Sequence, residues 1–285
     1  MKYFVAGSDP NDVRRVPSMS WLLEHESTGQ KVIFDLGIRK DIERYTPAVF
    51  ERLHNVIKSE VPEDVFASLT QKHIDPSSDI RAIIFSHLHY DHVGDPSKFG
   101  PKTEFIIGPG AKQLLHGPDS YPCNAFSHFD SRLLPQDRTV ELPPATDRSF
   151  WAPLGPFPDV HDFFGDQSMY IIDAPGHCPG HVNLLVRSDA NQWMLLAGDT
   201  THDTRILDGV GVTAVYLDEK TGRSKCAHHD KELAEIHLQR VQEMRKLENV
   251  QVILAHDNAI YNSLYDRFGS GLQTQYSIAH DMSFL

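Results

Sequence analysis

Three imidazoles and a carboxylate fall within six residues of one stretch, Phe85-Ser86-His87-Leu88-His89-Tyr90-Asp91-His92. The apolar run before it, residues 81–85, predicts a short buried strand, so these side chains are expected on the loop where the strand ends. Neutral imidazole nitrogens and carboxylate oxygens are the ligands that borderline divalent metals such as Zn²⁺ prefer. A chain with 17 histidines can form clusters by chance. The position at a strand end favours a metal site instead.

Three further apolar runs also end in a histidine or an aspartate. Residues 169–174 lead into Pro175-Gly176-His177-Cys178-Pro179-Gly180-His181, residues 193–197 into Gly198-Asp199-Thr200, and residues 250–255 into His256-Asp257. One such histidine alone is more often hydrogen bonded within its loop than bound to a metal. Four strand ends with metal-ligand side chains in one chain predict a metal centre.

The order HxHxDH, then PGHxxGH, then GD, then a histidine after an apolar strand resembles the metallo-β-lactamase superfamily. The pattern spans residues 87–256, and the turn Asp35-Leu36-Gly37 after the predicted strand 31–34 also resembles the family's early strand and turn. Within the superfamily the chain is most similar to N-acyl-homoserine lactonases. The resemblance implies an α+β fold, a four-layer αββα sandwich with its metals along one edge; periodicity alone predicts only α/β or α+β.

Carried over residue by residue, the resemblance implies two Zn²⁺ ions per chain. The first would be held by His87, His89 and His177, and the second by Asp91, His92 and His256, with Asp199 bridging the two. His177 is preferred to His181 because the family places its ligand at the first histidine of that loop. Iron, manganese and cobalt are alternatives to zinc, since affinity order and cellular supply both decide which metal is bound.

The predicted chemistry follows from this ligand set. Two cations about 3.5 to 4 Å apart can share a water and lower its pKa from 15.7 to roughly 7. The resulting bridging hydroxide would open a small cyclic ester or amide, a lactone or a lactam, and Asp91, Asp199 and His202 are the predicted catalytic residues. The chain lacks a Gly-x-Ser-x-Gly elbow, and its three cysteines have no catalytic context.

Two departures from the lactonase pattern bear on the substrate. The family places a tyrosine three residues after the bridging aspartate, and this chain has His202 there. An imidazole can donate or accept a proton near neutral pH. The alternative interpretation is a solvent-facing histidine paired with Asp203. The usual Gly-Gly after the first motif is Gly94-Asp95 here.

Other reactions of the same superfamily stay open on sequence grounds. A thioesterase of the glyoxalase II kind would need a basic patch for its thiol carrier, and no such patch is evident. The predicted ligand residues are also compatible with a mononuclear iron persulfide dioxygenase. The diiron oxygen-reducing branch is disfavoured because the second ligand is His89 and not a glutamate.

Residues 117–167 are rich in proline and aromatic residues, and their pattern predicts neither a regular helix nor a strand. Long loops in compact domains are usually functional or disordered, and aromatic residues argue against disorder. Two interpretations are left: a wall or lid over the metals, or a loop packed onto the domain. Because the ligands spread from 87 to 256, the whole chain, 1–285, is predicted to form one catalytic domain with this insertion near its active site.

Composition limits the partners and the compartment. The net charge is −12, from 27 basic and 39 acidic residues, which disfavours a nucleic-acid partner. No run approaches the roughly 20 apolar residues that span a bilayer, and the first ten residues do not resemble a signal peptide. The expectation is a cytoplasmic enzyme with a small-molecule substrate and no membrane or nucleic-acid partner. The sequence predicts no oligomeric state.

The remaining elements are predicted coarsely. Residues 18–24 and 31–35 predict paired strands. Residues 47–57 and 62–72 predict helices, each with a proline at its first position. A helix from Asp230 to about Leu247 would bury one apolar face, made of Leu233, Ile236, Val241, Met244 and Leu247.

Overall fold

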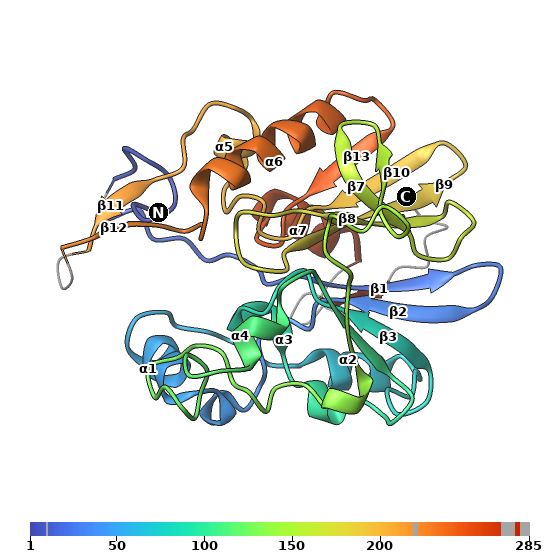
Figure 1. The fold of residues 1–285 in the computed structure, drawn as a ribbon, viewed down its shortest axis with the longest axis horizontal. Coiled ribbons are helices and arrows are strands. Elements are labelled where there is room, and N and C mark those ends of the chain that lie inside the picture. Colours follow the sequence, from blue (N-terminus) through green and yellow to red (C-terminus); the bar gives the residue numbers. More distant parts are fainter. Residues whose placement is uncertain (10, 219–221, 269–276, 280–285) are drawn as a thin grey trace. The chain divides into compact units, whose positions relative to one another are not determined.

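The computed structural model describes residues 1–9, 11–218, 222–268 and 277–279. The chain divides into two compact units (Figure 1). Unit 1 comprises Met1–Pro17 and Asp147–Tyr261, and unit 2 comprises Ser18–Thr146 and, as far as it is described, Asn262–Leu285. One catalytic domain over residues 1–285 stays a prediction.

Unit 2 is built on a six-stranded sheet in the order β14-β1-β2-β3-β4-β5. Its strands are β1 (Ser20–His25), β2 (Gln30–Phe34), β3 (Ile80–Ile84), β4 (Glu104–Ile107), β5 (Thr139–Glu141) and β14 (Ser277–Ala279). β1 pairs antiparallel with β2, and β2 to β5 pair in parallel. Because parallel neighbours end at the same edge, the segments after β2 and β3 meet there.

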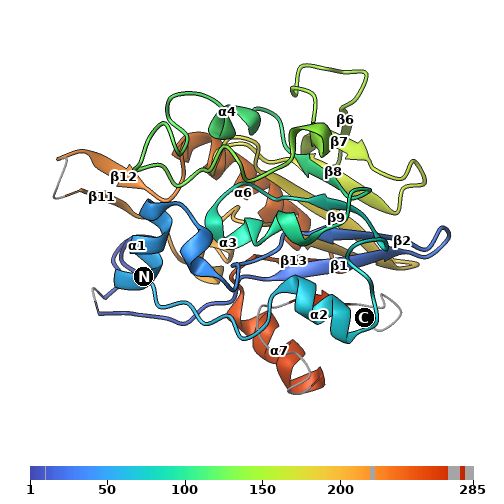
Figure 2. The same cartoon turned by 90° about the horizontal axis from the view of Figure 1, so that it is seen from below.

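Helices connect the strands of this sheet. They are α1 (Pro47–Asn55), α2 (Val65–Gln71), α3 (Tyr90–Val93) and α4 (Lys112–Leu115), with short 3-10 turns at Ile42–Arg44, Pro96–Lys98 and Gln136–Arg138. Val65 and Leu69 of α2 pack in a buried cluster with Ile33, Ile83 and Phe105 of the strands, and Figure 2 shows α2 beside β1. The predicted start of α2 at Pro62 is wrong. Asp64 accepts a hydrogen bond from the Ala67 N–H at 2.9 Å, and this cap fixes the start at Val65.

Unit 1 has its own six-stranded sheet in the order β13-β10-β9-β8-β7-β6. Its strands are β6 (Ala152–Leu154), β7 (Phe157–Asp162), β8 (Met169–Asp173), β9 (Val182–Asp189), β10 (Gln192–Leu196) and β13 (Val250–Ile253), and β11 (Val215–Leu217) and β12 (Ser224–Cys226) form a separate hairpin. β8 and β10 both run antiparallel to β9, and β13 runs parallel to β10. β8, β10 and β13 therefore run in the same direction and end at one edge of the sheet.

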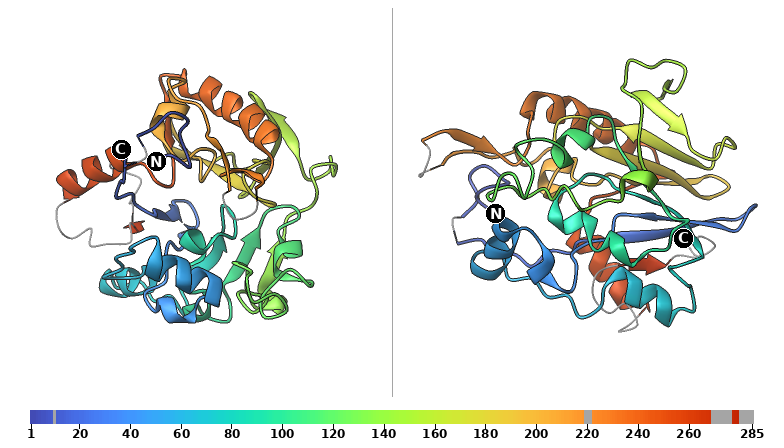
Figure 3. Two further views of the ribbon diagram at one scale, coloured as in Figure 1. Left: turned by 90° about the vertical axis from the view of Figure 1, so that its left-hand side faces the viewer. Right: turned by 60° about the horizontal axis from the view of Figure 1, so that its bottom comes forward.

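Helix α6 (Lys231–Arg245) covers one face of the unit 1 sheet (Figures 1 and 3). The shorter α5 (Thr204–Leu207) also belongs to this unit, and α7 (Asn258–Phe268) follows β13. Asp230 caps α6 as predicted, but the predicted buried face is partly wrong. Leu233, Ile236 and Leu247 are exposed, whereas Ala234, His237 and Leu238 are buried with Val241 and Met244. The buried stripe contains a small and a polar residue, which a count of large apolar side chains cannot find.

The segment 117–167 contains regular structure that the sequence did not predict. β5 lies at one end of the unit 2 sheet, and β6 and β7 lie at one end of the unit 1 sheet. These strands lack clear apolar alternation: all three residues of β6 are exposed. Both interpretations of the segment have support, since Phe129 stacks on His89 in unit 2 while Trp151 and Phe157 are buried in unit 1.

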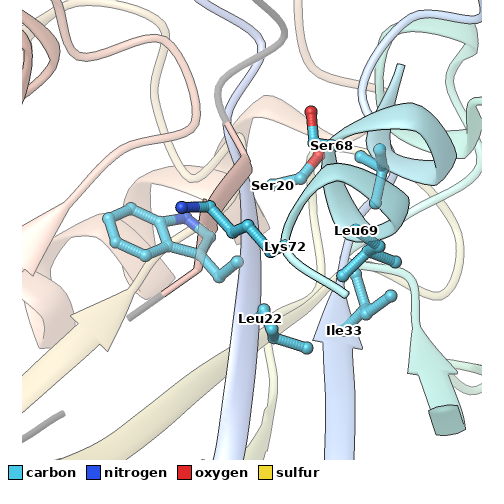
Figure 4. A pocket seen from close by; sticks show the side chains of 8 residues that line it. Ser20, Leu22, Ile33, Ser68, Leu69 and Lys72 are labelled. Atoms are coloured by element: carbon cyan, nitrogen blue, oxygen red, sulfur yellow. The ribbon is translucent and has the colours of Figure 1, made fainter. Parts of the chain in front are cut away.

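A small pocket in unit 2 lies between β1, β2 and α2 (Figure 4). Leu22, Ile33, Leu69 and Lys72 are among its lining residues, and none of the predicted metal ligands lines it. In the described part of the chain, no helix combines the length and the apolar character required to cross a membrane.

Candidate metal centre

Unit 2 presents four predicted ligands from one continuous stretch. His87 and His89 follow β3, and Asp91 and His92 lie on the single turn of α3, directly after His89. Nε2 of His87 lies 2.8 Å from Nδ1 of His89, and the ring centroids of His87 and His92 are 4.1 Å apart. Both His87 and His92 are buried. The tight turn after β3 therefore gathers these donors within a few ångströms.

Asp35, at the end of the neighbouring strand β2, holds this stretch in place. Its backbone is left-handed (φ 61°), a conformation that aspartate adopts more readily than most residues. Its carboxylate accepts hydrogen bonds from the Ser86 N–H (2.6 Å) and the Ser86 hydroxyl (2.7 Å), and it lies 2.8 Å from Nδ1 of His92. A proton on Nδ1 leaves the Nε2 lone pair of His92 for a metal.

Burial raises the pKa of Asp35, and the adjacent His92 and Ser86 oppose that rise. The sequence prediction included Asp35 only as part of a turn and gave it no role. The available signal was the pairing of two apolar runs whose ends carry Asp35 and Ser86, but the parallel register that joins them is not visible in the sequence.

Asp199 is the centre of the unit 1 donors. Its Oδ2 atom lies 3.5 Å from Nε2 of His177, and its Oδ1 atom lies 3.2 Å from Nε2 of His256. The Asp199 side chain is only 3% exposed. The two oxygens of one carboxylate thus face two different imidazoles.

The loop that carries His177 is held against the start of α6. Gly176 has φ 125°, and a Cβ atom there would lie 2.2 Å from the backbone nitrogen of Ala234. The His229 N–H donates to the His177 carbonyl at 2.9 Å, and the Asp230 N–H donates to the Gly176 carbonyl at 2.8 Å. Glycine is required at position 176 because both the conformation and the close approach exclude a side chain.

The second ring nitrogen distinguishes the histidines of unit 1. Nδ1 of His256 lies 2.5 Å from the Pro17 carbonyl, so it donates there and Nε2 is left to face Asp199. His181 donates from Nδ1 to the Ala174 carbonyl at 2.9 Å and accepts the Asp199 N–H on Nε2 at 3.1 Å. Both nitrogens of His181 therefore serve the backbone, in agreement with the preference for His177 as the ligand.

His202 also faces Asp199. Its Nε2 atom lies 3.1 Å from Oδ2 of Asp199, and its ring centroid lies 4.8 Å from that of Phe4. Asp203 instead forms hydrogen bonds with Arg205 at 2.8 and 2.9 Å and caps α5. The alternative interpretation, a solvent-facing His202 paired with Asp203, is therefore wrong.

Two buried histidines of unit 1 were not singled out from the sequence. His228 lies with its Nδ1 atom 3.2 Å from Nδ1 of His177, and burial lowers the pKa of His228 to about 3. His237 on α6 has its Nε2 atom 2.8 Å from the side chain of Asn183, and burial lowers its pKa to about 3 as well. Asn183 also contacts the hydroxyl of Thr200 at 3.1 Å, so this network supports the turn that carries Asp199.

The predicted ligands thus lie together within each unit. Unit 2 contributes His87, His89, Asp91 and His92, and unit 1 contributes His177, Asp199 and His256; all seven are among the His and Asp groups that could hold a metal ion. Imidazole nitrogens and carboxylate oxygens fit zinc and related divalent metals. In His92 and His256 a polar partner at Nδ1 favours the tautomer with its proton on Nδ1. The Nε2 lone pair then stays available to a metal.

Donors of this kind at the ends of strands are the working groups of metal-dependent hydrolases. The family is shown by comparison: the model of the metallo-beta-lactamase superfamily matches residues 13–256, so the chain belongs to that superfamily. The predicted membership and the predicted enzyme class, a metal-dependent hydrolase, are confirmed.

Two fungal proteins are similar in sequence. A gamma-lactamase of Gibberella moniliformis is 37% identical over 174 residues, which is 60% of this chain and 70% of that protein. A gamma-lactamase of Fusarium pseudograminearum is 35% identical over 196 residues, which is 65% of this chain. The match spans only 45% of the Fusarium protein.

A solved structure confirms the predicted fold class, the αββα metallo-β-lactamase fold. It is an N-acyl homoserine lactone hydrolase with N-hexanoyl-L-homoserine, the product, bound at its catalytic metal centre. The TM-score is 0.63 at 20% sequence identity, over 92% of this chain and 90% of that one. At this identity the likeness concerns the fold alone.

Proposed function

We propose that the chain is a dinuclear zinc hydrolase that opens a small cyclic amide, with a cyclic ester as the second substrate class. His87, His89 and His177 would hold one ion, Asp91, His92 and His256 the other, and Asp199 would be shared by both. The observation that carries the proposal is the geometry of Asp199 in unit 1, whose two oxygens face Nε2 of His177 and Nε2 of His256.

Bound together, two such cations supply a nucleophilic water near neutral pH and polarise the substrate carbonyl. The reaction forms a bond between the water oxygen and the carbonyl carbon and breaks the ring C–N bond. The products are a carboxylate and an amine, so the leaving nitrogen must gain a proton. Asp199, buried and in contact with three imidazoles, keeps the groups around the reacting carbonyl in a fixed arrangement.

His202 is the group proposed to deliver that proton. Its Nε2 atom points at Asp199, and Phe4 packs against its ring. An unprotonated amide nitrogen is a far poorer leaving group than an alkoxide, so ring opening of a lactam depends more on a proton donor than ring opening of a lactone does. A protonated imidazole is a stronger acid than a phenol, so it gives up its proton to a leaving nitrogen more readily.

Two observations therefore favour the cyclic amide over the cyclic ester. One is the histidine at position 202, where the lactonase pattern has a tyrosine. The other is the name of the two fungal relatives, both gamma-lactamases, at 37% and 35% identity. A five-membered lactam is the first substrate to test.

A hydrolysis panel of five-membered lactams, lactones and thioesters, run on zinc-loaded protein, tests this proposal. We expect hydrolysis of at least one lactam, and a loss of about a hundredfold or more for Asp199→Ala, because the shared ligand is removed. Asp208→Ala, at an exposed aspartate after α5, is the matched control and should keep wild-type activity. Equal activity of wild type and Asp199→Ala would refute the mechanism.

The same panel tests the role of His202. His202→Tyr is expected to lower kcat for the lactam about tenfold or more and to affect the lactone less, since the stronger acid matters most for the nitrogen leaving group. A lactam-to-lactone ratio unchanged by His202→Tyr would remove His202 from the mechanism. Turnover of thioesters alone would favour the thioesterase alternative, and iron-dependent oxygen consumption on a persulfide would favour the dioxygenase.

A further inference from the structure

His228 is a buried residue of unit 1 to which the proposed function gives no role. It is 6% exposed, and its Nδ1 atom lies 3.2 Å from Nδ1 of His177. The two rings meet edge to face, with centroids 5.3 Å apart and planes at 84°. The contact is thus made at the side of the His177 ring away from Nε2, the atom that faces Asp199.

A hydrogen bond between two Nδ1 atoms uses one proton, so one ring donates and the other accepts. When His177 donates, its Nε2 atom keeps the lone pair that a metal requires. When His228 donates, a neutral His177 carries its proton on Nε2 and cannot act as a ligand through that atom. The direction of this one hydrogen bond is therefore coupled to metal binding.

We infer that His228 is a positioning residue, the hydrogen-bond acceptor that holds His177 in the Nδ1–H tautomer needed for metal ligation. Imidazole ligands almost always donate their second N–H to a polar partner, which fixes both the tautomer and the ring orientation. In this role His228 carries its own proton on Nε2. The inference rests on the metal centre of the proposed function but not on its substrate.

The backbone fixes His228 beside the ligand loop. The residues that follow it, His229 and Asp230, donate their N–H groups to the carbonyls of His177 and Gly176 at 2.9 and 2.8 Å. The His228 N–H itself contacts the sulfur of Cys226, the last residue of β12, at 3.4 Å. Main-chain hydrogen bonds within unit 1 thus hold the two segments that carry His177 and His228 beside each other.

Three of the predicted ligand histidines have different kinds of group as the Nδ1 partner. His92 faces the carboxylate of Asp35, His256 faces the carbonyl of Pro17, and His177 faces the imidazole of His228. Of these three partners, His228 can be replaced by residues of similar size with or without a hydrogen-bond acceptor. The amide oxygen of asparagine takes about the same place as Nδ1 of histidine and is also a neutral acceptor. Leucine has a similar size and no acceptor.

Zinc affinity of the full chain, measured by titration with Zn²⁺ alone, compares these variants. His228→Leu is expected to bind zinc about 10- to 100-fold more weakly, and His228→Asn within about threefold of wild type. His229→Leu is the matched control, because His229 is exposed and contacts the ligand loop only through its backbone N–H. The unfolding temperatures of metal-free wild type, His228→Leu and His228→Asn are measured beside the affinities. If the three temperatures are equal, a weaker zinc affinity of His228→Leu alone reflects the lost hydrogen-bond acceptor and not a loss of stability.

Ring ¹⁵N chemical shifts of zinc-loaded wild-type protein provide a second readout, which also decides the matter if His228→Leu fails to fold. The expected result is a proton on Nδ1 of His177 and on Nε2 of His228. Wild-type affinity in His228→Leu, an equal loss in His228→Asn and His228→Leu, or a proton on Nδ1 of His228 would each overturn the inference. A protein that opens no ring in the substrate panel would refute the proposed function and leave these two readouts valid.

Discussion

The two units deliver their predicted ligands by different routes. In unit 2, His87, His89, Asp91 and His92 all follow one strand, β3. In unit 1, His177, Asp199 and His256 follow three strands, β8, β10 and β13, which share an edge because of the sheet topology. Ligands that follow one strand can be recognised in the sequence as a continuous motif. Ligands that the strand order brings together are recognised only as separate His or Asp residues at the ends of several predicted strands.

The units also differ in what supports their ligands. In unit 2 a single buried carboxylate, Asp35, connects Ser86 and His92. In unit 1 the support is distributed over the Pro17 carbonyl, the His228 ring and the network of Asn183 with His237. In unit 2, substitution of Asp35 alone should therefore weaken the support of several neighbouring residues. In unit 1, each substitution should affect only the ligand that the replaced residue contacts.

The largest expected effect separates a shared ligand from a single one. Asp199→Asn should reduce bound zinc to well below one ion per chain and kcat/KM by about a hundredfold or more, because in the proposed centre Asp199 is a ligand of both ions. Asp91→Asn should leave about one ion per chain, because only the second ion depends on Asp91. Metal analysis of the dialysed proteins measures this, and equal zinc content in the two variants would contradict the bridging role.

The next effect tests the packing of the His177 loop. Gly176→Ala should lower the free energy of unfolding by about 3 kcal/mol or more, because strain at positive φ adds to a clash with Ala234. Gly165→Ala is the matched control: φ is 77° there, and a Cβ atom meets nothing within 4 Å, so strain alone should cost about 1 kcal/mol. Urea unfolding of metal-free protein gives both values. Equal losses would show that the close approach to α6 is not limiting.

The support from Asp35 predicts a smaller change. Asp35→Asn keeps the size of the side chain but cannot accept from Ser86 and His92 together as the carboxylate does. Zinc affinity should fall about 10- to 100-fold, as for other partners of metal-binding histidines. Asp119→Asn, at an exposed position of the same unit, should bind zinc as wild type does; an unchanged affinity in Asp35→Asn would deny Asp35 its role.

The sequence predicts those parts of the candidate site that are local or follow a strand. Strand β3 and its ligand stretch, the three strand ends of unit 1 and the cap at Asp230 all follow from residue pattern and loop chemistry. His177 was preferred to His181 through the resemblance, and the two backbone hydrogen bonds of His181 supply the physical reason.

The missing parts depend on contacts between distant residues. Asp35 acts on His92 through the parallel pairing of β2 and β3, and His228 reaches His177 through backbone bonds of the next two residues. His237 was overlooked because α6 buries a stripe with a polar residue in it. β6 escaped prediction because its residues are exposed, so no apolar alternation marks it.

The smallest expected effect concerns pH and belongs to unit 1. The pKa of His237 is lowered to about 3 in the folded chain, while an unfolded histidine titrates near 6.5. Below pH 6.5 the unfolded chain binds a proton that the folded chain does not, so stability falls as the pH drops from 6.5 toward 3.

At pH 5.5 this penalty amounts to about 1.4 kcal/mol. His237→Gln keeps a donor near Asn183 but cannot be protonated. Because about 0.2 kcal/mol of the penalty is already present at pH 7, its loss of stability between pH 7 and pH 5.5 should be smaller than that of wild type by about 1.2 kcal/mol. Urea unfolding of metal-free protein at the two pH values measures the difference. Identical pH dependence in both proteins would mean that His237 is protonated in the folded state.

The central claim of the proposed function is that the seven predicted ligands hold one pair of metal ions. Anomalous diffraction from crystals of the zinc-loaded protein tests it most directly. The expected map contains two zinc ions, one bound by His87, His89 and His177, the other by Asp91, His92 and His256, with Asp199 on both. Zinc bound to the donors of one unit alone, or absent from both sets at saturating metal, would contradict the account.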